Sequence, residues 1–375
     1  MLLRASQTTV AVPNGKKVIC YDFVSKQSVE CAIETLYWLS CFKDWNTPEE
    51  IATLHPKLDR GSLVQQIEQL RKLGLLYSRQ SPQAKIQDEF VESWQMGPAA
   101  AILHFATFDS KFMTLQDSKK RQLTKTKSAP PPALYWQDRT GALIERSDAP
   151  SNISNLINLM AMRRTVRTVT KDAPSKDQLI DCLFAGLGIT GFVKTDVCTL
   201  PLKMTPSGGA RNPYEAYICV QRIEGLEAGF YHFSAFDGKL KLLKRGKMKA
   251  AGSLVADQDW ANDMPAIIFL VAIMERTMWK YPDSNAYRVM LIEAGHIGQN
   301  IMLAATGNAL SACPTAALSH TKINIKFGLK RMTHAPIYAL ALGRPDARHE
   351  NIIPNLKAIP WVTAQTTELA RHVGQ

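Results

Sequence analysis

No stretch of this chain is apolar for long enough to cross a bilayer. The longest apolar runs, such as AIIFLVAIM at 266–274, have the length of a strand, whereas a transmembrane helix needs about 20 apolar residues. The N-terminus, MLLRASQTTVAVPNGKK, lacks the continuous apolar core of a secretory signal. The seven cysteines are scattered, odd in number and form no C-x-x-C pair. These absences argue against a disulfide framework or a zinc ribbon, and predict a cytoplasmic protein with reduced thiols and no membrane partner.

Signatures of metal sites and of hydrolases are missing as well. No H-x-x-x-H and no G-x-S-x-G occurs, and Glu293-x-x-His296 has no second E-x-x-H to complete a carboxylate-bridged metal site. We therefore predict no metal, and expect Glu293 and His296 to be polar groups on a buried helix.

The net charge of +12 favours anionic partners. However, the densest basic stretch, at 111–127, has no interleaved aromatic residues for base stacking. We expect a solvated loop there and no nucleic-acid partner.

What the chain does contain indicates an α+β protein in three parts. Residues 1–80 predict three short helices and a strand, a winged-helix-like pattern: a helix over 28–42, a second one after the Thr47–Glu50 capping box, and a third between Asp59 and Gly74. The third helix carries its only basic residues at its end, whereas a DNA-reading helix contacts bases near its N-terminus. Residues 1–80 are therefore expected to bind a peptide. Residues 81–150 are expected to be a connecting region with the basic loop, in which GPAAAILHFATFD is a strand or a short helix.

Residues 151–375 alternate between helix and strand patterns and form the expected catalytic domain. Helices are predicted for SNISNLINLMAMRR, capped by Ser151 or Asn152, and for SKDQLIDCLFAGLGIT. Strands are predicted for EAYICVQRI, AIIFLVAIM and APIYALALG, with a hairpin around Asp237-Gly238. A long helix begins near Ser284 and is apolar or small on nearly every face, which is typical of a large core or a subunit interface. The pattern predicts a mainly antiparallel sheet around this helix.

Two segments of this domain suit an anionic ligand. In MRRTVRT, the side chains of Arg163, Arg164, Thr165 and Arg167 can surround a phosphate, or they can compensate the dipole at a helix C-terminus. In TPSGGARNPY, glycines let the backbone approach a ligand closely, although an ordinary tight turn has the same pattern. This turn is neither a dinucleotide-binding fingerprint nor a P-loop.

A lysine–tyrosine pair suits proton transfer. Lys280 and Tyr281 lie between Arg276 and Arg288, and crowding by cations favours the neutral form of a lysine. A surface lysine beside a helix-entry tyrosine is the alternative interpretation. Further along, GNALSACPTAAL supplies small residues against which a flat ring can lie. Cys313 in this segment has no basic partner and is expected to pack rather than to react.

Taken in order, six segments resemble the SagB-type dehydrogenases of the nitroreductase superfamily, over about residues 155–346. The segments are MRRTVR, TPSGGARNPYEAY, FYHF, ERTMWKYPDSNAYRVMLIEAGHIGQN, GNALSACPTAAL and ALGRP. The resemblance implies a nitroreductase-like FMN-binding α/β sandwich domain, FMN as cofactor and a homodimer. It also implies a role in ribosomal peptide maturation: a thiazoline or oxazoline of a precursor peptide is oxidised to the azole by hydride transfer to flavin N5. A cyclodehydratase complex is a possible partner, and relatives carry a winged-helix peptide clamp before the catalytic domain.

The resemblance also assigns roles to individual residues. Lys280 and Tyr281 match the pair that handles the proton, and Pro282 stands where the family pattern has glycine. The residues that match cofactor-binding positions are Arg163, Arg164, Thr165 and Arg167 for the phosphate and ribityl chain, Ser207, Gly208, Gly209 and Arg211 for the isoalloxazine, Ala312 and Cys313 on the N5 side, and Arg344 on the phosphate side.

Other functions stay open from the sequence. An NAD(P)H-dependent flavin reductase acting on dehydroamino acids, nitro compounds or quinones would use the same FMN pocket. A catalytically silent scaffold that grips a leader peptide would need only the first 80 residues. A transcription factor would rest on the winged-helix pattern alone and predicts salt-sensitive DNA binding.

Overall fold

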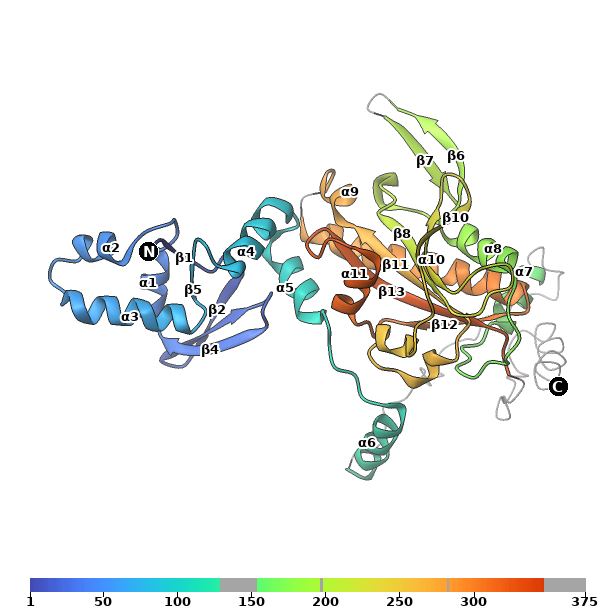
Figure 1. Cartoon of the computed structure of the whole chain (residues 1–375), viewed down its shortest axis with the longest axis horizontal. Helices are drawn as coiled ribbons and strands as arrows, with labels where there is room; N and C mark the ends of the chain where they lie inside the picture. The colour runs from blue at the N-terminus through green and yellow to red at the C-terminus, as the bar shows by residue number, and fades with distance from the viewer. Residues whose placement is uncertain (129–153, 196–197, 282, 347–375) are drawn as a thin grey trace, which may run out of the picture.

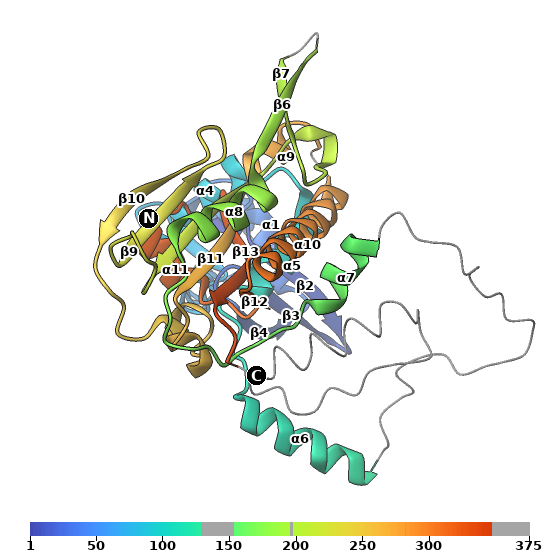
Figure 2. The ribbon, with the colours of Figure 1, turned by 90° about the vertical axis from the view of Figure 1, so that its right-hand side faces the viewer.

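The fold is described from a computed structural model that covers residues 1–128, 154–195, 198–281 and 283–346 (Figures 1 and 2). Its centre is an antiparallel sheet of six strands in the order β10-β9-β8-β11-β13-β12. The strands are β8 (Tyr214–Val220), β9 (Gly229–Ser234), β10 (Lys239–Arg245), β11 (Ala266–Ile273), β12 (Ser311–Thr315) and β13 (His334–Gly343). The predicted strands, the hairpin around Asp237-Gly238 and the α+β class are confirmed.

The central strand β11 explains why its sequence is a continuous apolar run. Successive side chains of a strand point to opposite faces of the sheet. Ile268 and Leu270 pack into the core on one face, while Ile267 and Phe269 pack into the core on the other. Because both faces are covered, no position of β11 can be polar without burying an unpaired group.

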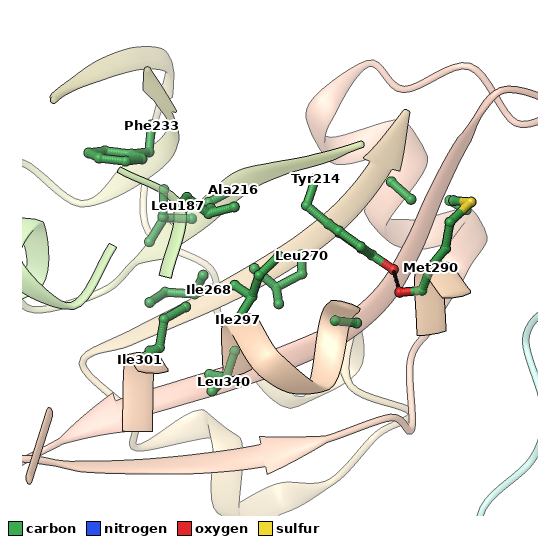
Figure 3. Packing of buried hydrophobic residues seen from close by; sticks show 14 of the residues in the cluster. Leu187, Tyr214, Ala216, Phe233, Ile268, Leu270, Met290, Ile297, Ile301 and Leu340 are labelled. Carbon is green, nitrogen blue, oxygen red and sulfur yellow. Dashed lines mark hydrogen bonds between the residues drawn. The ribbon is translucent and has the colours of Figure 1, made fainter. Parts of the chain in front are cut away.

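Helix α10 (Ser284–Gly307) covers one face of the sheet together with α8 (Lys176–Leu187), as Figure 3 shows in part. Tyr214 of β8 donates a hydrogen bond from its hydroxyl to the Met290 carbonyl at 2.7 Å, which ties the helix to the sheet (Figure 3). The predicted long helix is confirmed. The prediction that this helix is buried on nearly every face is wrong for the single chain, because Ile292 is 53% exposed and His296 is also exposed.

Smaller elements complete this part of the chain. They are helices α7 (Ser154–Met162), α9 (Met274–Met278) and α11 (His320–Phe327), the short 3-10 turns η1 (Gly208–Ala210), η2 (Ala251–Leu254) and η3 (Asp259–Asn262), and the hairpin of β6 (Ile189–Lys194) and β7 (Thr199–Lys203). The hairpin, which the sequence patterns missed, projects from the body of the protein (Figures 1 and 2). The predicted cap residues of α7, Ser151 and Asn152, lie outside the described residues.

The N-terminal unit contains a sheet of three strands that the sequence patterns missed. It comprises β2 (Thr9–Asn14), β3 (Lys17–Asp22) and β4 (Gln27–Ala32). The helix predicted over 28–42 is wrong in its first half, because residues 27–32 pair with β3. Val29 and Cys31 alternate along β4 and pack on the small N-terminal core, and this long-range pairing outweighs the local helical spacing. The true helix, α1 (Thr35–Cys41), follows the strand.

The remaining N-terminal elements agree with the prediction. Helix α2 (Pro48–Leu54) begins at Thr47 with both hydrogen bonds of the capping box to Glu50. Helix α3 (Arg60–Lys72) is capped by Asp59. Strand β5 (Leu76–Ser78) follows and pairs with β1 (Leu3–Ala5).

Residues 82–128 are more helical than predicted. Helices α4 (Pro82–Ser93) and α5 (Gly97–Thr107) pack into the same core as α10, through residues such as Phe90 and Phe105. The solvated loop expected at 111–127 is instead mostly helix α6 (Leu115–Ser128), whose start is capped by Thr114. Because α6 carries no apolar stripe, hydrophobic periodicity could not reveal it. Among the described residues, no helix has the length and hydrophobicity that a membrane span requires.

Two buried histidines lie where α5 meets α10 and α11. His104 Nδ1 is 2.9 Å from the Tyr287 hydroxyl, and the His320 ring stacks on Phe108 with centroids 4.2 Å apart. Burial lowers the pKa of His104 to about 3 and that of His320 to about 4. Both rings are therefore neutral in the folded protein at pH values where they take up protons in the unfolded chain.

We expect acid to destabilise the protein through these histidines. Between pH 6.5 and 4 the unfolded chain binds more protons, so the free energy of unfolding falls as the pH falls, by at most about 1.4 kcal/mol per pH unit and histidine. Urea unfolding of His320→Gln, followed by tryptophan fluorescence, should give a shallower dependence on pH than the wild-type protein, and His55→Gln serves as control. An unchanged slope in His320→Gln would contradict the assignment.

Candidate functional site

The glycine turn at residues 207–211 is anchored to α10. Ser207 donates a hydrogen bond from its hydroxyl to Glu293 Oε2 at 2.8 Å and accepts one from the Asn212 amide at 2.8 Å. Burial raises the pKa of Glu293, while hydrogen bonds from the Ser207 hydroxyl and the Gly208 amide oppose that rise. A Cβ on Gly208 would lie 2.6 Å from Val289 Cγ1. The turn therefore lies flat against the N-terminal half of the helix.

The same turn contacts the lysine–tyrosine pair. Gly209 has a φ of +61°, and a Cβ there would overlap the Tyr281 hydroxyl and lie 2.9 Å from Lys280 Nζ. Lys280 Nζ also lies 5.3 Å from the centre of the Tyr281 ring. Lys280 is exposed and Tyr281 is half-buried. The fold thus brings together two predicted site segments that lie about 70 residues apart in the sequence. Pro282, the next residue, lies outside the described residues.

Arginines fix the position of this turn from the side of α9. Arg211 stacks over the Trp279 ring at 4.6 Å and donates from Nε to the Arg276 carbonyl at 2.9 Å. Arg276 donates to the Asn212 carbonyl at 2.9 Å and forms an ion pair with Glu215 at 2.6 Å. Sequence reasoning placed Arg276 beside Lys280 as a crowding cation; in the fold it is paired with a carboxylate.

Sequence reasoning missed the residues that complete this network. Glu215 also forms a hydrogen bond with His232 Nε2 at 2.9 Å. Trp279 forms the stacking surface for Arg211. Burial is the largest single influence on Glu215 and favours a higher pKa, but the hydrogen bond from His232 and the charge of Arg276 together hold the pKa of this carboxyl below its ordinary value. The sequence signal that could have revealed Glu215 was a carboxylate within an otherwise apolar strand.

The basic segment 163–167 runs beside β12. The Val166 amide donates to the Ser311 hydroxyl at 3.3 Å, and that hydroxyl donates to the Arg164 carbonyl at 3.3 Å. Arg163 Nη1 is 3.4 Å from the Thr165 hydroxyl. Arg167 is exposed. Arg164 is used locally, since its Nη1 donates to the carbonyls of Ala161 and Arg163 at the end of α7. For Arg164 the geometry matches the helix-end role.

The other predicted residues lie on neighbouring strands. Ala312 and Cys313 are buried in β12, opposite Leu342 and Ala341 of β13. Burial raises the pKa of Cys313 to about 11, with the charge of Arg167 opposing it, which agrees with the packing role expected for this thiol. Arg344 follows β13 and donates from Nη2 to Gln178 at 3.3 Å.

The predicted residues therefore form two groups on one chain. The turn group comprises residues 207–211, 280–281 and Glu293, and the strand group comprises residues 163–167, 312–313 and Arg344. Among the described residues, no hydrogen bond, ion pair or ring contact joins the groups directly. The turn group packs near Val289 and Glu293, while α7 reaches α10 at Gly307. Along the helix axis, Gly307 lies about 21 Å from Glu293 and about 27 Å from Val289.

Comparisons with known proteins match the part of the chain that contains both groups. The sequence profile of the nitroreductase family matches residues 160–344. The trifolitoxin-processing protein TfxB of Rhizobium leguminosarum bv. trifolii is 30% identical over 157 residues, which cover 40% of this chain and 41% of that protein. A nitroreductase-like protein of Methanocaldococcus jannaschii is 27% identical over 193 residues, covering 50% of this chain and 90% of that protein.

Solved structures with a similar fold include two with stated ligands. In the E. coli microcin synthetase McbBCD complex with truncated pro-MccB17 bound, one chain is 19% identical, with a TM-score of 0.49, covering 69% of this chain and 97% of that chain. The NADPH:FMN oxidoreductase of Vibrio harveyi complexed with NAD+ is 16% identical, with a TM-score of 0.37, covering 54% of this chain and 74% of that chain.

Proposed function

Because residues 160–344 form a nitroreductase-family domain, we propose that this protein is an FMN-dependent dehydrogenase of the SagB type in ribosomal peptide maturation. Its substrate is a thiazoline or oxazoline ring of a precursor peptide, which it oxidises to the azole. The observation that carries the proposal is the contact of Gly209 with Lys280 and Tyr281. It places a side-chain-free surface directly beside a group that can take a proton.

The residues present fit FMN. In the strand group, Arg163, Thr165, Arg167 and Arg344 would hold its phosphate, since guanidinium forks match phosphate oxygens. In the turn group, the missing side chain of Gly209 lets the Tyr281 hydroxyl and Lys280 Nζ lie directly against the backbone, where they would border a flat ring held by the turn. When bound, FMN supplies the acceptor for the hydride that leaves the substrate.

The chain itself handles the proton. Aromatising an azoline removes a Cα proton, and Lys280 Nζ is the base that accepts it. The Tyr281 hydroxyl, which faces the same space beside Gly209, shares or relays that proton. The Ser207–Glu293 hydrogen bond keeps the turn in place while the substrate binds.

A homodimer would bring the two groups together around each FMN. Apolar side chains remain exposed on α10 and α7 of the single chain: Ile292 is 53% exposed, Leu156 46% and Met160 43%. A second copy that covers these side chains would remove apolar surface from water. It would also place the turn group of one subunit against the strand group of the other.

The N-terminal unit is proposed to bind the precursor peptide. A groove of about 450 Å³ between α1 and α3 is lined in part by Tyr37, Trp38 and Leu58. The outer edge of β4 has no strand partner among the described residues. An extended peptide can add to such an edge and place its side chains in a neighbouring groove. A cyclodehydratase that forms the azoline would be the functional partner, and the free state of all seven cysteines suits a reducing cytoplasm.

Mass spectrometry of a co-expressed, cyclised precursor peptide tests the function. We expect the loss of two hydrogen atoms per ring with the wild-type protein, and no loss with an Arg163→Ala/Arg167→Ala variant, which should also lack the yellow absorbance of bound flavin. A gain of two hydrogen atoms would indicate the reductase instead. A colourless wild-type protein that does not take up added FMN would leave only a peptide-binding scaffold.

A further inference from the structure

A second cavity lies behind the glycine turn. It has a volume of about 360 Å³ and is lined by the base of the β6–β7 hairpin, the turn itself and strands β8 and β9. Its charged lining residues are Lys203, Arg211, Arg276 and Glu215, with His232 beside them. Three cations face one carboxylate, so the cavity carries a net charge of +2 when His232 is neutral.

The charges in this cavity are unequally satisfied. Glu215 is fully used, since one oxygen pairs with Arg276 at 2.6 Å and the other with His232 at 2.9 Å. The Lys203 ammonium, in contrast, has no hydrogen bond and no ion pair within 4 Å in the described part of the chain. Its side chain is partly buried at the base of the hairpin. Burial lowers the pKa of Lys203, and the more distant carboxylates of Glu215 and Glu293 oppose this.

A partly buried ammonium without a partner is unfavourable, because charged groups in protein interiors are normally paired. Arg211 adds a second charge, since its guanidinium stacks on Trp279 and has no carboxylate within 4 Å among the described residues. Two unneutralised cations around one small cavity are a site for an anion.

The position of the cavity indicates which anion it receives. Arg211 lies two residues after Gly209, and its stacking partner Trp279 directly precedes Lys280. A peptide whose azoline ring lies at Lys280 would therefore have a neighbouring residue within reach of the cavity. The volume lies at the lower end of the range of about 300–1,000 Å³ for small-molecule pockets, so the cavity accommodates a single acidic side chain or chain end.

We propose that this cavity is a carboxylate subsite, in which Lys203 and Arg211 bind an acidic group of the peptide beside the ring that is oxidised. The peptide as ligand rests on the proposed function. The acid can be a side chain or a C-terminal carboxylate, and both present the same chemistry to the two cations.

Calorimetric titration of the purified full chain tests the subsite without turnover. The probes are N-acetylglutamate N-methylamide (a side-chain acid), N-acetylglycine (a terminal acid) and the neutral N-acetylglutamine N-methylamide. We expect at least one acid to bind about tenfold more tightly than the neutral probe. The acid that binds identifies the source of the carboxylate. Equal affinities for all three probes would overturn the proposal.

Variants show whether Lys203 is responsible. Lys203→Met should lower the affinity for the acid about tenfold, to that of the neutral probe, whereas Lys203→Arg should keep it. Lys194→Met, at an exposed position of the same hairpin, is the matched control. Equal losses in Lys203→Met and Lys194→Met would contradict the subsite. If Lys203→Met does not fold, as seen by circular dichroism, loss of acid binding in Lys203→Arg would contradict it instead.

Two outcomes separate this inference from the proposed function. A chain that never binds FMN but binds the acid through Lys203 would retain the subsite and refute the oxidase. A flavin-loaded chain that oxidises azolines and binds all probes equally would refute the subsite alone. Displacement of the acid by inorganic phosphate at equal concentration would also count against a carboxylate site.

Discussion

Replacing Lys280 with alanine is expected to reduce azole formation by about 100- to 10,000-fold, the usual contribution of a general base. The side chain is exposed, so its removal leaves no cavity in the core. The free energy of unfolding and the flavin content should therefore stay near those of the wild-type protein. Single-turnover reduction of bound flavin by a cyclised peptide measures the effect directly.

The variant Lys280→Arg distinguishes a base from a charge. Arginine keeps the positive charge near Gly209 but does not lose its proton in proteins. If Lys280 acts as the base, Lys280→Arg should be as inactive as Lys280→Ala. Recovery of activity in Lys280→Arg would show that the residue only positions an anion, and a normal rate in Lys280→Ala would refute its role altogether. Tyr281→Phe should give a smaller loss if the hydroxyl relays the proton.

Replacing Gly209 with alanine is expected to abolish activity for a different reason. The new methyl group would overlap the Tyr281 hydroxyl and lie 2.9 Å from Lys280 Nζ. Both side chains would have to move, and displacement of a reacting group by about 1 Å can cost about 100-fold in rate. The displaced side chains would also move into the region beside the turn that we assign to the flavin ring, so the affinity for FMN should fall together with the activity.

Gly238 offers a matched control for this substitution. Its φ of +64° is nearly the same as that of Gly209, yet a Cβ added to Gly238 in the β9–β10 turn would have no neighbour within 4 Å. Gly238→Ala therefore has the same backbone strain, about 1–2 kcal/mol, without the collision. We expect Gly238→Ala to bind FMN and turn over normally. If both variants behave alike in flavin titration and turnover, the loss of activity reflects backbone strain. The proposed role of the close contact between Gly209 and the lysine–tyrosine pair would then be refuted.

These two tests address different halves of the site. Lys280→Ala removes a reacting group and leaves the turn unchanged, whereas Gly209→Ala keeps every reacting group and displaces the two side chains that lie against the turn. A protein in which the first variant loses turnover and the second loses flavin would have both functions in the turn group. The strand group is tested separately by the arginine variants, because it lies beside β12 and not at the turn.

Local sequence determined several elements of the fold. The capping box at Thr47, the Asp237-Gly238 turn and the apolar run of β11 each depend on residues close together in the chain, so their elements could be predicted. The ordered motifs also indicated the candidate residues of the site. Their grouping required the tertiary structure, since the contact of Gly209 with Lys280 crosses about 70 residues of chain.

Only the tertiary structure decided the other features. Strand β4 forms because β3 offers it hydrogen bonds and a buried face, although its residues also fit a helical spacing. The exposed face of α10 and the unpaired charge of Lys203 depend on which surfaces neighbouring elements cover. Hydrophobic periodicity shows which side chains prefer burial, but not which neighbouring element buries them. Contacts between distant segments therefore could not be predicted from the sequence.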